Sequence, residues 1–130
     1  MTRENIHHLP RLGMGDAMRL FGMTARALRF YEEKGLVEAR RDRLNARYFD
    51  GPARQRLAWI SRLRAAGVSL PEICEVLQAE EDDGRGRECA LAKVERRRAE
   101  LASELARVDE TIASLQPTAD PASRRIAVRG

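Results

Sequence analysis

Residues 24–49 read TARALRFYEEKGLVEARRDRLNARYF, and the order of elements in this stretch decides the fold. Thr24 is a good helix N-cap, because its hydroxyl can accept a hydrogen bond from a backbone N–H of the first turn. Leu28 and Tyr31 follow at helical spacing, and Gly35 stands where a helix commonly ends on a left-handed residue. The stretch therefore begins with a short helix that carries basic and aromatic side chains.

After this helix the sequence predicts a basic β-hairpin. Residues 36–37 and 47–49 are expected to form two short strands, which Val37, Tyr48 and Phe49 favour. The segment between them is rich in arginine. A helix followed by a cationic hairpin is typical of a winged helix-turn-helix, which places the helix in a major groove and the hairpin against neighbouring phosphates.

Further helices are predicted on both sides of this stretch. Residues 14–21 have helical periodicity and stop at Gly22, which makes a helix-turn-helix with the segment that follows. Asp50 is expected to cap the next helix. Ser69 begins a capping box for the one after it. Trp59 lies on or near a buried stripe, so a core role is favoured over base stacking.

Charge is unevenly distributed along the 130 residues. Residues 1–78 carry 14 Lys and Arg against 9 Asp and Glu, a net charge of +5, whereas residues 79–116 carry 7 against 10, a net charge of −3. A basic first half beside an acidic second half indicates a polyanionic partner for the first half only. Aromatic residues are only 5% of the chain and charged residues 34%, which favours a small helical protein over a sandwich or barrel.

The longest periodic segment spans residues 89–116. Its apolar residues, with one arginine among them, alternate by three and four, as in the a and d positions of a coiled coil. A stripe this narrow on so long a helix cannot bury itself within one small domain, so a second chain is implied. The expected dimerisation residues are Leu91, Val94, Arg98, Leu101, Leu105, Val108, Ile112 and Leu115.

Charge predicts that the two helices of this coiled coil run antiparallel. Folding the helix back on a partner about Ser103 pairs every seam position with another seam position, for example Leu101 with Leu105. It also sets the basic run 96–98 beside the acidic pair 109–110 of the other chain. A parallel arrangement would bring the three arginines against their own copies, and like charges at that distance repel.

The predicted fold class is mainly α, a winged helix-turn-helix domain followed by a long antiparallel coiled-coil dimerisation helix. The expected boundaries are a flexible leader over 1–12, the DNA-binding domain over 13–79, a charged linker over 80–87, the dimerisation helix over 88–116 and a disordered tail over 117–130.

Several function classes are not favoured. No apolar run approaches the roughly 18 residues that span a membrane, and the N-terminus lacks the apolar core of a signal peptide, so a cytoplasmic location and free thiols are expected. No Ser-His-Asp set, Gly-rich phosphate loop or pair of catalytic carboxylates is evident. We therefore expect neither an enzyme nor a cofactor.

Several separately placed motifs resemble the MerR family of bacterial transcription regulators. They are LRFYEEKGL at 28–36, NARYF at 45–49, LRAAGVSLPEI at 63–73 and the C-terminal coiled-coil helix, so the resemblance covers roughly residues 12–116. It implies a homodimer that binds an imperfect palindrome in double-stranded DNA. The site often lies in an over-long promoter spacer, which the protein distorts to help RNA polymerase, a further partner.

The resemblance also implies which residues meet DNA. Arg26, near the start of the recognition helix, is expected to read a base, because a guanidinium can bond two acceptors on a guanine edge. Tyr31, Arg47 and the other arginines of the hairpin are expected to contact phosphate or pack beneath it. Phe30 stands where the family usually has a hydroxylated or imidazole-bearing ring. The expected DNA-binding residues are Thr24, Arg26, Arg29, Phe30, Tyr31, Arg40, Arg41, Arg43, Asn45 and Arg47.

Metal binding is not expected, although metal-sensing relatives place a cysteine where Cys89 stands. No Cys or His follows Cys89 in the sequence, and a well-held ion needs three or four ligands, which neither Cys74 nor the adjacent His7 and His8 completes. Two alternatives to a plain DNA-binding regulator stay open. One is a thiol-responsive switch that uses Cys89, and the other is a coiled-coil adaptor with residual DNA binding.

Overall fold

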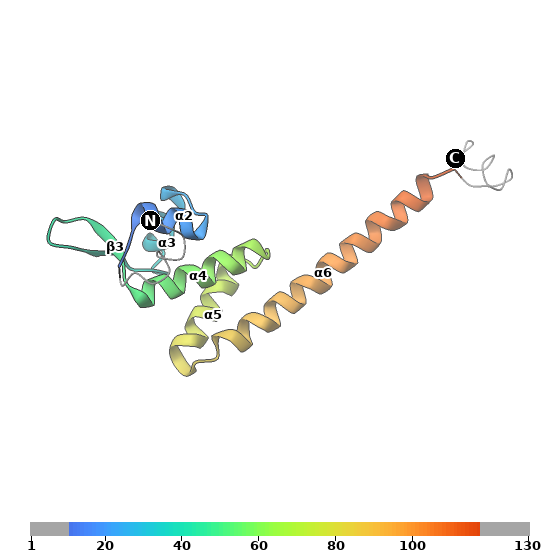
Figure 1. Cartoon of the computed structure of the whole chain (residues 1–130). Coiled ribbons are helices and arrows are strands. Elements are labelled where there is room, and N and C mark those ends of the chain that lie inside the picture. The colour runs from blue at the N-terminus through green and yellow to red at the C-terminus, as the bar shows by residue number, and fades with distance from the viewer. Residues whose placement is uncertain (1–10, 118–130) are drawn as a thin grey trace. The chain divides into compact units, whose positions relative to one another are not determined.

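The fold is mainly helical, as the sequence predicts. The computed structural model describes residues 11–117, and the chain divides into two compact units, Met1–Glu95 and Arg96–Gly130. Most of the expected leader, with His7 and His8, and nearly all of the expected disordered tail lie outside the described residues. In chain order the elements (Figure 1) are β1 (Leu12–Gly13), α2 (Met14–Phe21), α3 (Ala25–Glu33), β2 (Arg40–Arg41), β3 (Arg47–Phe49), α4 (Gly51–Ala65), α5 (Leu70–Asp83) and α6 (Gly86–Leu115).

Helices α2 and α3 form the predicted helix-turn-helix. Gly22 ends α2 with a left-handed φ of 62° and donates its backbone N–H to the carbonyl of Met18. Thr24 caps α3, because its hydroxyl oxygen accepts a hydrogen bond from the backbone N–H of Ala27 at 3.0 Å. With a cap on each side of so short a turn, the direction in which α3 leaves α2 is well defined.

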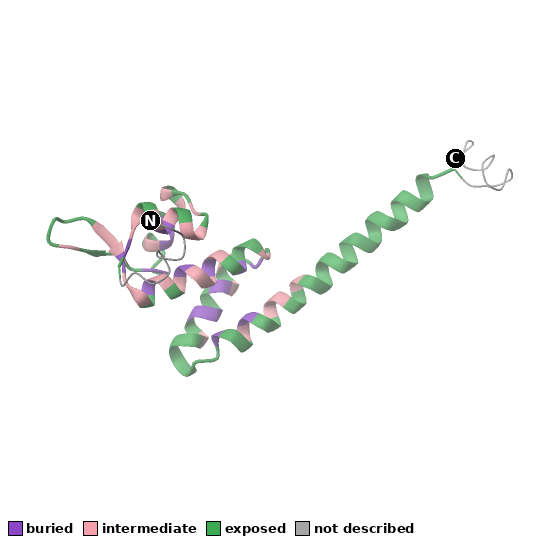
Figure 2. Cartoon of the chain, in the orientation of Figure 1, coloured by how far each residue is buried: buried purple, intermediate pink, exposed green. Residues whose placement is uncertain are grey.

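The core of the first unit lies where helices α2 to α5 meet the strands (Figure 2). Burial of apolar side chains from α2 to α5, β1 and β3 holds them together, whereas β2 consists of two exposed arginines. Trp59 is partly buried and packs against the same core, in agreement with its predicted core role. The largest fully buried side chains are Phe49, Leu12, Leu28, Leu57, Ile60, Ile73 and Val76.

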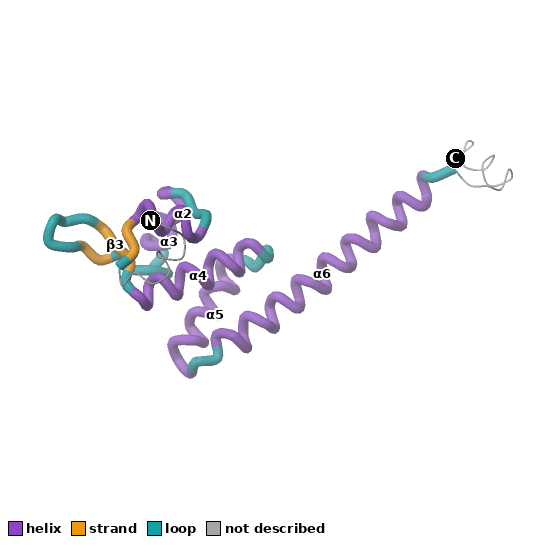
Figure 3. Tube along the Cα trace, in the orientation of Figure 1, coloured by secondary structure: helices purple, strands orange, loops and turns teal. Residues whose placement is uncertain are grey.

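The sheet differs from the prediction. Its strand order is β1-β3-β2, both pairings are antiparallel, and the loop between β2 and β3 forms the tip of the hairpin (Figure 3). The strand predicted at residues 36–37 is wrong, because Leu36 and Val37 are core residues outside any strand. The hairpin turn closes within residues 42–46, so β3 pairs with the residues just before that turn. Strand β1 is only two residues long and carries no periodic signal.

The other two N-caps that the sequence predicts, Asp50 and Ser69, are also present. Asp50 caps α4 by accepting a hydrogen bond from the backbone N–H of Ala53 at 3.0 Å. Ser69 caps α5 by accepting one from the backbone N–H of Glu72 at 3.4 Å, and its hydroxyl donates to the Glu72 carboxylate at 3.0 Å. Each cap satisfies backbone donors of a first turn that have no partner within the helix.

The expected linker over 80–87 is mostly helical. Helix α5 continues to Asp83 and α6 begins at Gly86, so only Gly84 and Arg85 lie between the two helices. Glu80 accepts a hydrogen bond from the backbone N–H of Gly86 at 2.9 Å, which places a carboxylate at the positive end of α6. Acidic side chains are compatible with an exposed helix. The lack of apolar residues here therefore means that this part of the helix is exposed to solvent, and not that the helix ends.

The second unit is described as a helix, the part of α6 from Arg96 onward. In this described helix the large apolar side chains are all exposed, with 45% of Leu101, 61% of Leu105, 55% of Val108, 49% of Ile112 and 78% of Leu115 accessible to solvent. An isolated helix with such a stripe leaves apolar surface in water that a partner helix would cover.

Candidate nucleic-acid interface

Helix α3 turns one face to the core and the other to solvent. Leu28 is fully buried and Tyr31 is 8% exposed, whereas Arg26 and Arg29 are exposed. Within residues 11–117 neither guanidinium makes an ion pair or a side-chain hydrogen bond. Both groups are therefore available for a ligand, and Arg26 lies in the first turn of the helix, where a recognition helix commonly reaches base edges.

Two aromatic rings lie in the second half of this helix. Phe30 is 40% exposed and meets Tyr31 edge to face, with ring centroids 5.9 Å apart. The ammonium group of Lys34 lies 5.6 Å from the centroid of the Phe30 ring. Phe30 has no polar atom, so it can contribute only packing and a cation–π contact here.

The tip of the hairpin is rigidly built. A single oxygen of the Asp42 carboxylate accepts the backbone N–H groups of Leu44 and Ala46, each at 2.9 Å. Asn45 adopts a left-handed φ of 64°, which asparagine tolerates better than most residues, and its carbonyl accepts a hydrogen bond from Arg41 at 2.9 Å. These contacts fix the turn and leave Arg43 projecting into solvent.

The four arginines of the hairpin fall into two groups. Arg40 pairs with Asp50 at 2.8 Å, and Arg47 pairs with Glu32 of α3. Arg41 donates to a backbone carbonyl only, and Arg43 makes no ion pair with a carboxylate in the described part of the chain. The first pair of arginines ties the hairpin to the helices, while the second pair keeps its positive charge uncompensated.

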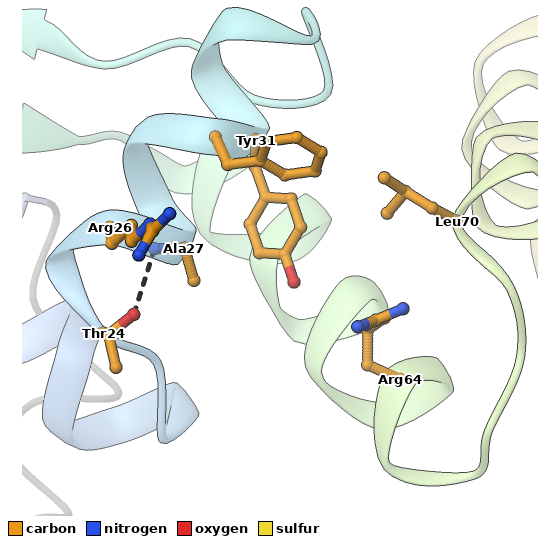
Figure 4. A pocket seen from close by; sticks show the side chains of 7 residues that line it. Thr24, Arg26, Ala27, Tyr31, Arg64 and Leu70 are labelled. Carbon is orange, nitrogen blue, oxygen red and sulfur yellow. Dashed lines mark hydrogen bonds between the residues drawn. The ribbon is translucent and has the colours of Figure 1, made fainter.

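An open hollow of about 470 Å³ lies beside α3, between this helix, Arg64 of α4 and Leu70 of α5 (Figure 4). In this view the Tyr31 hydroxyl points toward the guanidinium of Arg64, which comes from the last turn of α4. The sequence did not single out Arg64 as a candidate DNA-binding residue, because a single arginine in a helix has no distinctive spacing. The hollow is lined by Thr24, Arg26, Ala27, Phe30, Tyr31, Arg64 and Leu70.

The two cysteines are free. Cys74 is exposed, and Cys89 is half-buried against the core of the first unit. Among residues 11–117 no three His, Cys, Asp or Glu side chains are grouped so that they could hold a metal ion. In the same part of the chain, no helix has the length and apolar character needed to cross a membrane.

The expected dimerisation residues occupy α6 in both units. Leu91 is 57% exposed, and Val94 is half-buried because it packs against the core of the first unit. Arg98 is exposed, as are the five apolar seam positions that follow it. Most of the predicted seam is therefore accessible to a partner helix, whereas Val94 already packs in part against the core of the first unit.

Comparisons with known proteins agree with this architecture. Residues 12–80 match the family described as MerR HTH family regulatory protein, and residues 54–118 match the family described as MerR, DNA binding. The HTH-type transcriptional regulator CueR of Escherichia coli O157:H7 is 30% identical over 106 residues, which is 81% of this chain and 76% of that relative.

Solved structures share the fold. HiNmlR, a MerR family regulator lacking the sensor domain and crystallised bound to promoter DNA, aligns with a TM-score of 0.60 and 23% identity over 79% of each chain. The HTH-type transcriptional regulator SkgA from Caulobacter crescentus aligns with a TM-score of 0.55 and 30% identity over 90% of this chain and 87% of its own. Because a family model matches more than half of the chain and a curated relative agrees with it, this protein belongs to the MerR family of DNA-binding transcriptional regulators and is not an enzyme.

Proposed function

We propose that the chain binds an inverted-repeat promoter site as a homodimer and distorts that site. The observation that carries the proposal is the grouping of uncompensated arginines on two neighbouring elements. Arg26 and Arg29 project from α3, and Arg41 and Arg43 from the hairpin, none of them paired with a carboxylate among the described residues. HiNmlR, which shares the fold, was crystallised on promoter DNA.

Different arginines have different tasks in this proposal. Arg26 reads a base edge in the major groove, where a bidentate guanidinium recognises guanine. Arg41 and Arg43 neutralise phosphates beside the groove, with Asn45 shaping the turn that presents them. Arg64 and the Tyr31 hydroxyl, which face the hollow beside α3, bind another phosphate of the same backbone.

The dimer forms through the exposed stripe of α6. An antiparallel pairing about Ser103 would cover Leu101 with Leu105 of the partner and Val108 with Arg98 of the partner. Leu101, Leu105 and Val108 are each about half exposed or more in the single chain, so a partner helix removes substantial apolar area from water. The long stem of Arg98 can lie along apolar neighbours while its charge reaches solvent or an acidic residue.

Distortion follows from having two linked binding units. A dimer holds its two recognition helices at a fixed separation. Both half-sites can be bound at once only when the distance between them in the DNA equals this separation. A promoter spacer of another length must bend or twist to be bound, at a cost that depends on its sequence. Such a change repositions the promoter elements for RNA polymerase, which we therefore expect as a functional partner, and the protein would work in the cytoplasm on chromosomal DNA.

Selection from random duplexes tests the proposal. The full-length protein should enrich a single inverted repeat, and circular-permutation assays should show that bound DNA is bent. The selected site should be protected as two half-sites in footprinting. Failure to enrich any sequence would contradict the proposed function.

The thiol switch through Cys89 is the second candidate. Cys89 is half-buried against the core at the start of α6, so its oxidation would disturb packing next to the dimerisation helix. Cys89→Ser protein tests it, because a switch requires that oxidant changes DNA binding of the natural protein and not of this variant. We expect both proteins to bind DNA equally, with or without oxidant.

A further inference from the structure

One ion pair joins the recognition helix directly to the hairpin. Glu32 lies in the last turn of α3, Arg47 is the first residue of β3, and a guanidinium nitrogen of Arg47 contacts a carboxylate oxygen of Glu32. The pair is largely shielded from solvent, since 15% of the Glu32 side chain and 31% of the Arg47 side chain are exposed. Shielding of this degree strengthens an ion pair relative to the solvated pairs of a protein surface.

The position of Arg47 in the sheet makes the carboxylate important. Arg47 and Arg41 are directly opposite each other in the antiparallel pairing of β2 with β3, so their side chains leave the same face of the sheet. Like charges in that relation destabilise strand pairing. The carboxylate of Glu32 compensates the positive charge of Arg47. The guanidinium of Arg41 instead donates a hydrogen bond to the backbone carbonyl of Asn45, at the hairpin tip.

We propose that Glu32 is a positioning residue for DNA recognition. Through Arg47 it holds the hairpin at a fixed place relative to α3. Arg26 in the groove and Arg43 on the phosphates can then be engaged at the same time. This inference rests on the proposed function and adds that an acidic residue near the DNA-binding face is required for specificity.

Two simpler accounts of Glu32 lead to different results. If the carboxylate acted only through its charge, its removal would tighten binding to every DNA, because one negative charge near the phosphates would be gone. If the pair served only the stability of the fold, its removal would lower the melting temperature and reduce all binding together. A positioning role predicts a loss that is confined to the specific site.

Glu32→Gln is the first variant to measure, with Glu33→Gln as its matched control. Glu33 is the next residue, is exposed, and makes no ion pair within the described residues, so both variants lose the same charge one position apart. Dissociation constants for the selected inverted repeat and for a random duplex are measured at one salt concentration, together with thermal melting. We expect Glu32→Gln to weaken specific binding about tenfold and to leave random binding unchanged or tighter. Its melting temperature should fall only modestly, so that the variant is fully folded at the temperature of the binding assay.

A double-mutant cycle with Arg47→Gln completes the test. Because both residues act as one unit, the double variant should bind the specific site about as well as either single variant. If Arg47 instead contacted a phosphate, Arg47→Gln alone would weaken binding to random DNA and reduce its salt dependence. The positioning role would be overturned if the losses of binding free energy in the two single variants added up in the double variant. It would also be overturned by equal effects of Glu32→Gln and Glu33→Gln, or by a large fall in melting temperature. Failure of the natural protein to prefer the selected site would overturn the proposed function and this inference with it.

Discussion

Leu105→Ala should weaken the dimer, and the size of the effect can be worked from the structure. Leu105 is 61% exposed in the single chain, although it lies in the middle of the apolar stripe of α6. Truncation to alanine removes three carbons, each contributing about 0.8 kcal/mol when transferred out of water, or about 2.4 kcal/mol in all. If the partner covers the exposed part, dimerisation loses about 1.5 kcal/mol for each copy of the residue.

Both copies of Leu105 contribute, so the loss is about 3 kcal/mol per dimer, which corresponds to a dimer dissociation constant raised roughly 150-fold. Sedimentation equilibrium of the full chain over a range of concentrations measures this constant. Glu104→Ala is the control, because it changes an exposed residue next to Leu105 that is not on the seam. Equal effects of the two variants, or an unchanged constant for Leu105→Ala, would refute the assignment of this stripe as the dimer interface.

Three further predictions concern the proposed contacts. Arg26→Ala should reduce the binding free energy by about 1–3 kcal/mol and remove the preference for one base pair of the site. Binding to a set of sites that each carry one substituted base pair measures this. Arg43→Ala should weaken specific and random DNA alike and reduce the slope of log affinity against log salt by about one; a change at one sequence only would argue against a phosphate contact. In a background without the natural cysteines, Arg98→Cys with Val108→Cys should cross-link between chains and Val108→Cys alone should not. Efficient cross-linking of the single variant would mean that the helices run parallel.

Local chemistry explains why so much of the fold was predictable. Thr24, Asp50 and Ser69 cap the helices that the sequence assigned to them, because a cap depends on residues within three positions along the chain. The exposed stripe of α6 was readable from its spacing for the same reason, since helical periodicity is a property of the segment itself. The exposed positions of Arg26 and Arg29 follow from the same periodicity around Leu28.

The sheet and the roles of the hairpin arginines depend on contacts that are distant in sequence. Leu36 and Val37 lie in the core and not in a strand. The turn that Asp42 closes makes Arg40 and Arg41, and not these residues, the partners of β3. Glu32 and Arg47 are fifteen residues apart and meet only when β3 packs beside α3. The sequence alone determined that this protein carries a recognition helix, a cationic hairpin and a helix with an apolar stripe. Only the tertiary structure decided which arginines are compensated and which remain available for DNA, because ion pairing depends on which side chains the packed backbone brings together.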